Sequence, residues 1–172
     1  MLKVRFIMKR VLVFGFGNAD RQDDGVAWHI LVGLAQKMNL ITPSEPGDLF
    51  TSSKNQILLQ FNLQLTPELA ETINDFDVIY FVDAHTGAIN EDISFTSIIP
   101  QTQSSPFTHH LSPQMLLSIT QTIYGTVPKA FLLSVRAYEF SFSRELSQKT
   151  SALSKNAIAL LYGEISKAID VN

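Results

Sequence analysis

The stretch from Val11 to Val26 constrains the fold more than any other part of the chain. It begins with an uninterrupted apolar run, turns at Gly15 and Gly17, and places Asp23 and Asp24 before residues with the apolar spacing of a helix. An apolar run bounded by glycine is typical of a strand buried on both faces, and glycine allows a sharp turn at its end. The pattern predicts carboxylates at the carboxyl end of a buried strand, the usual ligand-binding edge of an open α/β sheet.

Further strands and helices alternate along the chain. Strands are expected at residues 10–16, 57–65, 77–83, 93–99 and 129–135, and helices at 24–38, from Thr66, from Pro113, and at 146–168. Residues 40–55 are expected to be a surface excursion, and residues 84–87 a loop. Thr66 and Ser112 are predicted N-caps, because each precedes a proline at a first helical position. This alternation predicts a three-layer α/β sandwich, in which helices cover both faces of a twisted, mostly parallel sheet.

Length and composition limit the function classes. The 172 residues fit one domain, residues 1–172, in which residues 1–7 before Met8 are expected to be either a non-native or flexible extension or a longer first strand. A formal charge of −3 leaves no electrostatic footprint for nucleic acid or an anionic membrane. The absence of cysteine excludes a thiolate metal site and a cysteine nucleophile. No export signal and no apolar run of about 18 residues occurs, so the expected location is the cytoplasm.

Common catalytic motifs are absent, but three positions remain as a candidate site. The Gly-x-Gly turn is not completed as a dinucleotide fingerprint, and its acids would repel phosphate. The remaining candidates are Asp24, Asp83 and one histidine, either His109 or His110, all at strand exits or helix entrances. Two carboxylates and an imidazole suit a divalent transition ion and leave coordination positions open.

Each candidate also has a purely structural interpretation. One acid of the Asp23-Asp24 pair can cap the first helix, and Asp83 can form an Asx turn. The two histidines can belong to a polar loop before an N-cap. His29 and His85 are expected to make packing or turn contacts rather than to bind metal.

Several motifs in order resemble the hydrogenase maturation endopeptidases, which process the large subunit of nickel-iron hydrogenases. The resemblance runs from about Lys9 to Leu161 and rests on these motifs: GFGNADRQDDGVA, QLTPELAETI leading to VIYFVDA, THHLSPQMLLSI, VPKAFLLSV and a late ELS. The family's nickel-binding positions fall on Asp24, Asp83 and His109, because His109-His110-Leu111 matches the family's His-x-Leu pattern.

The resemblance implies an endopeptidase that removes a C-terminal extension from the nickel-loaded large subunit precursor. It implies a sheet of about five strands with helices on both sides. Nickel is then supplied by the precursor rather than held permanently, and Asp24 and Asp83 are the catalytic candidates. Either the metal activates the scissile carbonyl or a water, or it docks the substrate while an aspartate acts as general base.

The chain departs from the family in two places. Residues 136–144 lack the glycines of many members, which indicates a different loop conformation, and Asp24 replaces the Glu of some members. Three alternatives stay open: a metal-dependent hydrolase of a small substrate, a non-catalytic module that binds a nickel-loaded partner, and, last, a nucleotide-binding domain.

Overall fold

The computed structural model describes residues 9–42, 44–46, 50–51, 56–102 and 111–170. The predicted extension at residues 1–7 lies outside them. The elements are β1 (Val11–Phe16), a 3₁₀ turn η1 (Gln22–Gly25), α1 (Val26–Lys37), β2 (Phe50–Thr51), β3 (Ile57–Asn62), α2 (Leu69–Asn74), β4 (Val78–His85), β5 (Ile93–Ile98), α3 (Pro113–Tyr124), β6 (Lys129–Arg136) and α4 (Gln148–Asp170).

One mostly parallel sheet organises the described residues. Its strand order is β2-β3-β1-β4-β6-β5. The four inner strands β3, β1, β4 and β6 are parallel to one another, whereas β2 and β5 pair antiparallel at the two edges. The predicted α/β class is therefore confirmed, with β2, which has two residues, as an addition to the five expected strands.

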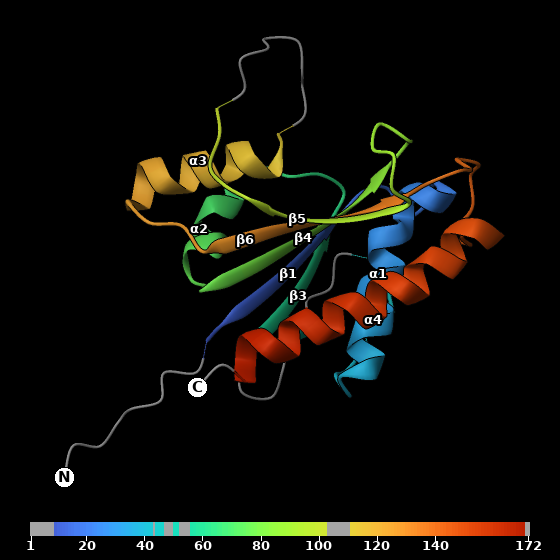
Figure 1. Cartoon of the computed structure of the whole chain (residues 1–172), viewed down its shortest axis with the longest axis horizontal. Helices are drawn as coiled ribbons and strands as arrows, with labels where there is room; N and C mark the ends of the chain where they lie inside the picture. The colour runs from blue at the N-terminus through green and yellow to red at the C-terminus, as the bar shows by residue number, and fades with distance from the viewer. Residues whose placement is uncertain (1–8, 43, 47–49, 52–55, 103–110, 171–172) are drawn as a thin grey trace.

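Helices cover both faces of the sheet (Figure 1). On one side α1 and α4 pack over a core that includes Val13, Ile30 and Leu161. On the other side α2 and α3 pack over a second core that includes Phe81 and Leu116. Side chains alternate between the faces of a strand, so the apolar runs of β1 and β4 supply both cores.

Three predicted element boundaries are wrong. β4 continues through Ala84 and His85, which were expected in a loop, because both residues pair with β6. β3 ends at Asn62 rather than at residue 65, because its pairing with β1 also ends at Asn62. Thr66 does not cap α2, because the chain first makes a tight turn in which the Leu69 N–H donates to the Thr66 carbonyl. Ser112 caps α3 as predicted, and its side chain accepts from the Met115 N–H.

The strand order creates a switch point between β1 and β4. From β1 the chain passes through α1 to β3 on one side, whereas from β4 it passes through β5 and α3 to β6 on the other. The segments that follow β1 and β4 therefore diverge at the carboxyl edge of the sheet. Ligands of open α/β sheets bind in the crevice at such a point.

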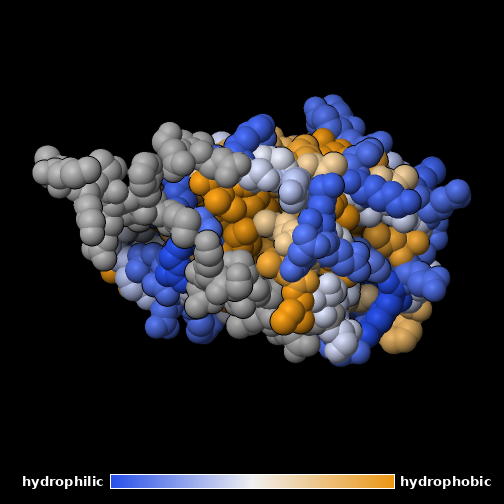
Figure 2. Space-filling view, turned by 90° about the horizontal axis from the view of Figure 1, so that it is seen from below, coloured by the Kyte–Doolittle hydropathy of each residue, from blue (hydrophilic) through white to orange (hydrophobic). Residues whose placement is uncertain are grey.

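The surface is mixed in character. In Figure 2, hydrophobic residues gather near the centre of the face shown, and hydrophilic residues border them. Among the described residues, the most exposed large apolar side chains lie in separate segments of the chain. They are Ile41, Leu63, Ile99 and Phe142. None of the helices in the described part of the chain is long and apolar enough to span a bilayer.

Candidate functional site

Asp24 and Asp83 flank the switch point. Asp24 lies in η1, which follows β1, and Asp83 lies near the end of β4. The two carboxylates are close enough for the charge of Asp24 to act on Asp83. Two residues that are 59 positions apart, as their numbers show, thus meet at the predicted edge of the sheet.

The Asp83 carboxyl is only partly exposed, and its surroundings disfavour its charge. Burial, together with the negative charge of Asp24, raises the pKa of Asp83 to about 7, although a hydrogen bond from the Ala84 N–H opposes the rise. That N–H donates to Asp83 Oδ1 at 2.8 Å. A carboxyl with this pKa can accept or release a proton near neutral pH. A bound cation would favour its ionised form.

The turn after β1 holds Asp24 in place. The Asn18 N–H donates to Asp24 Oδ2 at 3.0 Å. Gly17 has φ +139°, and a Cβ there would overlap the backbone oxygen of Asp24. Glycine at this position therefore lets the turn approach the segment that carries the acid.

Asp23 has a different role from its neighbour. It is fully buried, and its carboxylate accepts five hydrogen bonds: from the N–H groups of Tyr138, Glu139 and Ser147, and from the hydroxyls of Ser147 and Thr150. Burial alone would raise its pKa, but the hydrogen bonds outweigh burial and the pKa is lowered. Asp23 is therefore an ionised anchor rather than a free acid.

The late ELS motif and the segment 136–144 both take part in this anchor. Ser147, the last residue of the motif, binds Asp23 and also caps the start of α4, because its Oγ accepts from the Thr150 N–H at 3.3 Å. Neither acid of the pair makes a side-chain cap on α1, whose N-cap is Gly25. Local pattern could not reveal the anchor, because its partners lie at least 115 residues away.

The third predicted ligand, His109, lies outside the described residues, as does the alternative His110. Leu111, which follows them, packs in the core under α2 and α3. That is the face of β4 on which Asp83 stands, because Phe81 belongs to the same core and strand side chains alternate. Within the described residues, no group of three or more His, Asp or Glu side chains could hold a metal ion.

The other two histidines make structural contacts, as expected. His29 Nε2 lies 2.8 Å from the Arg144 carbonyl oxygen and donates to it. Burial lowers the pKa of His29, although that hydrogen bond and the charge of Asp23 oppose the change. His85 Nδ1 accepts from the Gly87 N–H at 3.2 Å.

A groove opens beside the turn that holds Asp24. Its volume is about 610 Å³, and it is lined by residues 17–20, 45–46, 60–63 and Arg144. The lining combines the side-chain amides of Asn18, Gln60 and Asn62 with the apolar groups of Phe61 and Leu63. Amides can pair with a peptide backbone, and the apolar groups can contact side chains.

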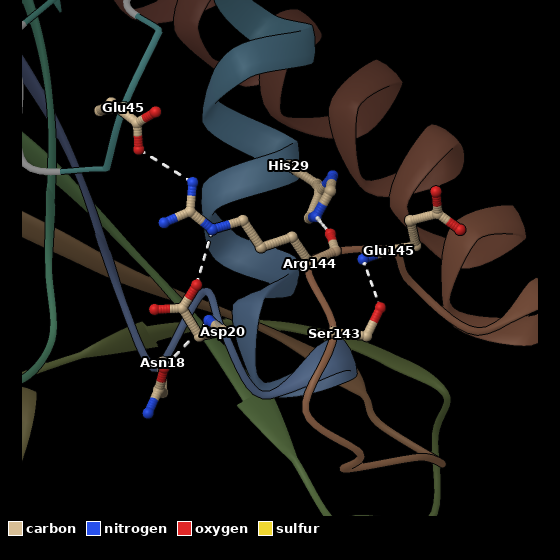
Figure 3. Close-up of polar contacts among 7 residues, drawn as sticks. All are labelled: Asn18, Asp20, His29, Glu45, Ser143, Arg144 and Glu145. Carbon is tan, nitrogen blue, oxygen red and sulfur yellow. Dashed lines mark hydrogen bonds and ion pairs between the residues drawn. The ribbon is translucent and has the colours of Figure 1, made fainter.

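Arg144 joins three segments at the rim of this groove (Figure 3). Its guanidinium donates to Asp20 at 2.6 Å and to Glu45 at 2.9 Å, while its carbonyl accepts from His29. Both ion pairs are exposed to solvent, which screens them, so they contribute little to stability. Their chief effect is to position residues 20 and 45 beside the groove.

Several solved structures with a similar fold are named as hydrogenase maturation proteases or peptidases. The hydrogenase maturating endopeptidase HybD from E. coli superposes with a TM-score of 0.65 at 20% identity, over 92% of this chain and 93% of that one. The [NiFe] hydrogenase maturation protease HycI from Thermococcus kodakarensis gives a TM-score of 0.60 at 19% identity, over 93% and 94%. The hydrogenase 2 maturation peptidase from Thaumarchaeota archaeon SCGC_AB-539-E09 gives 0.58 at 20%, over 92% and 99%.

The comparison shows a shared fold along nearly the whole length of each chain. No protein-family model and no curated protein sequence matches the chain.

Proposed function

We propose that this chain is a hydrogenase maturation endopeptidase, which removes a C-terminal extension from the nickel-loaded large subunit precursor of a nickel-iron hydrogenase. The observation that carries the proposal is the meeting of Asp24 and Asp83 at the switch point. Both acids were selected from the sequence, and the fold around them is that of structures named as maturation proteases.

In this proposal the nickel ion belongs to the substrate. Asp24 and Asp83 supply carboxylate oxygens, and His109 supplies an imidazole nitrogen, a donor set that suits a divalent transition ion. The donor set is incomplete without the precursor's own ligands, so an unloaded precursor binds weakly. Specificity then comes from a ligand that only the correct substrate carries.

The reaction is hydrolysis of one peptide bond. The oxygen of a water molecule adds to the scissile carbonyl carbon, the C–N bond breaks, and the proton of the water passes to the departing amine. The ionised Asp83 carboxylate can accept that proton as a general base and pass it on to the amine. Nickel at the site would polarise the carbonyl or lower the pKa of the water.

The groove beside Asp24 supports a polypeptide substrate. Asn18, which lines the groove, also donates its backbone N–H to Asp24, so the groove and the proposed ligand share one turn. The amides and apolar groups of the groove suit an extended chain.

Substitution of the proposed ligands tests this function. Asp24→Ala and His109→Ala are expected to abolish processing of a nickel-loaded precursor while the protein stays folded, because each removes a proposed metal ligand. Glu91→Gln, in the exposed turn before β5, is the matched control and should process normally. Processing at the wild-type rate by a folded Asp24→Ala/His109→Ala double variant would reject the assignment.

A further inference from the structure

His85 carries a buried hydrogen-bond donor that no described residue pairs with. The side chain is 8% exposed, and its Nδ1 accepts the Gly87 N–H. An imidazole nitrogen that accepts carries no proton, so the proton of the neutral ring is on Nε2. Nε2 is buried and has no hydrogen-bond partner among the described residues.

An unpaired buried donor requires an explanation. Burial of such a group without an acceptor is unfavourable, because the group loses its hydrogen bond to water. Most buried polar groups in native proteins are paired, and the exceptions include groups that serve a catalytic or binding role. Phenylalanine or leucine at this position would avoid the cost. The donor is therefore a candidate for a partner that arrives with a ligand.

The position of His85 indicates where that ligand lies. His85 follows Asp83 by two residues in β4, so both side chains stand on the same face, about 7 Å apart along the strand. Their register partners in β6 are Ser134 and Arg136. The unpaired donor thus belongs to a side chain on the same face of β4 as Asp83, the face covered by α2 and α3.

The chemistry of the donor limits the class of ligand. A nitrogen that carries a proton cannot coordinate a metal ion, so nickel is not its partner. The partner must be an acceptor, and a polypeptide substrate brings a carbonyl oxygen with every residue.

We propose that His85 Nε2–H donates a hydrogen bond to the carbonyl oxygen of the peptide bond that is cut, which makes His85 a further catalytic residue. The inference rests on the proposed function. As water adds to the carbonyl carbon, this oxygen gains negative charge, and a prepositioned donor stabilises it more strongly than it stabilises the ground state. The bond must therefore affect turnover more than substrate binding.

Two amide substitutions separate the nitrogens of the ring. His85→Asn keeps an acceptor for the Gly87 N–H, as in an Asx turn, but loses the donor at Nε2. His85→Gln places an amide N–H near the position of Nε2 and loses the acceptor at Nδ1. Thr86→Ala, at the exposed neighbour, is the matched control.

Steady-state processing of a nickel-loaded precursor is measured for all four proteins, with thermal unfolding as a check on folding. For His85→Asn we expect kcat to fall about 100-fold with KM within about twofold of wild type. His85→Gln should recover most of kcat, and Thr86→Ala should match wild type. An unchanged kcat in His85→Asn, or a change confined to KM, overturns the inference.

A measurement on the unsubstituted protein removes dependence on the folding of the variants. In ¹⁵N-histidine-labelled protein, the Nε2 proton of His85 should shift when the nickel-loaded precursor binds, and the absence of a shift on binding overturns the inference. A wild-type protein that binds the precursor and does not cut it rejects the proposed function, and the inference falls with it. Normal cutting by wild type and by His85→Asn rejects the inference alone.

Discussion

Asp23 and Asp24 are adjacent residues with opposite surroundings. The Asp23 carboxylate is buried among five donors from residues 138–150. Asp24 accepts one hydrogen bond from a described residue, the N–H of Asn18, and lies close enough for its charge to raise the pKa of Asp83. One acid therefore holds the fold together, and the other is left for chemistry.

Matched amide substitutions should separate these two roles. Asp23→Asn removes the charge from five charge-assisted contacts and sets an NH₂ group against donors, so we expect the free energy of unfolding to fall by about 3–5 kcal/mol. Asp24→Asn keeps an acceptor for the Asn18 N–H. It should change the free energy of unfolding by less than about 1 kcal/mol, while processing is lost. Urea unfolding measures both values, and equal stability losses would contradict this division.

The raised pKa of Asp83 predicts a pH-dependent stability. The folded protein holds the Asp83 proton up to about pH 7, whereas an unfolded chain releases it near pH 4. The folded state thus binds more protons between these values, and stability falls as pH rises from about 4 to about 7. Asp83→Asn removes the buried charge, so it should stabilise the protein at pH 8 by up to about 4 kcal/mol and scarcely at pH 4.

Chemical unfolding of metal-free Asp83→Asn and wild type at several pH values measures this difference. Glu91→Gln, at an exposed carboxyl, serves as the control and should show no such trend. A gain in Asp83→Asn that is the same at pH 4 and pH 8 would contradict the assigned pKa.

At the scale of elements, the turn between β1 and η1 depends on Gly17. Alanine there would need a positive φ and would overlap the Asp24 backbone, so Gly17→Ala should lower the free energy of unfolding by more than about 1 kcal/mol and impair processing. Gly163→Ala, within α4, meets no atom within 4 Å and should raise stability by about 0.5–1 kcal/mol. Denaturant unfolding of both variants tests this contrast, which a harmless Gly17→Ala would refute.

The elements that local pattern predicted correctly are those whose cause is local. β1 and β4 are continuous apolar runs, and α3 has its own cap and proline. The wrong boundaries occur where pairing with a strand distant in sequence determines where a strand ends. β4 extends to His85 because β6 continues beside it, and β3 ends at Asn62 because its pairing with β1 ends there. Thr66 followed by Pro67 has the composition of a cap, but its tight turn delays α2 to Leu69.

Part of the candidate site could also be predicted from local sequence patterns. Asp24 and Asp83 follow apolar strands, and strand ends meet at one edge of a parallel sheet, so their proximity could be inferred. The burial of Asp23 could not be inferred, because its hydrogen-bond donors come from residues 138–150. His109 rests on the family resemblance and stays a prediction.

At the scale of the whole molecule, the strand order assembles the site. α1 returns the chain to β3 on one side of β1, and β5 and α3 return it to β6 on the other side of β4. Where these connections diverge, η1 carries Asp24 and the end of β4 carries Asp83. Similar folds at about 20% identity reach the same arrangement of elements, because buried strands and crossover handedness constrain topology more than individual residues do.

The most direct test of the account is the intact mass of a hydrogenase large subunit precursor after incubation with this protein. Nickel-loaded and nickel-free precursor are treated in parallel, with Asp24→Ala as the inactive control. The account predicts loss of a C-terminal fragment from the nickel-loaded precursor alone, and only with the wild-type protein. An unchanged mass for a nickel-loaded precursor that a known maturation protease does cut, or equal cutting of both precursors, would contradict it.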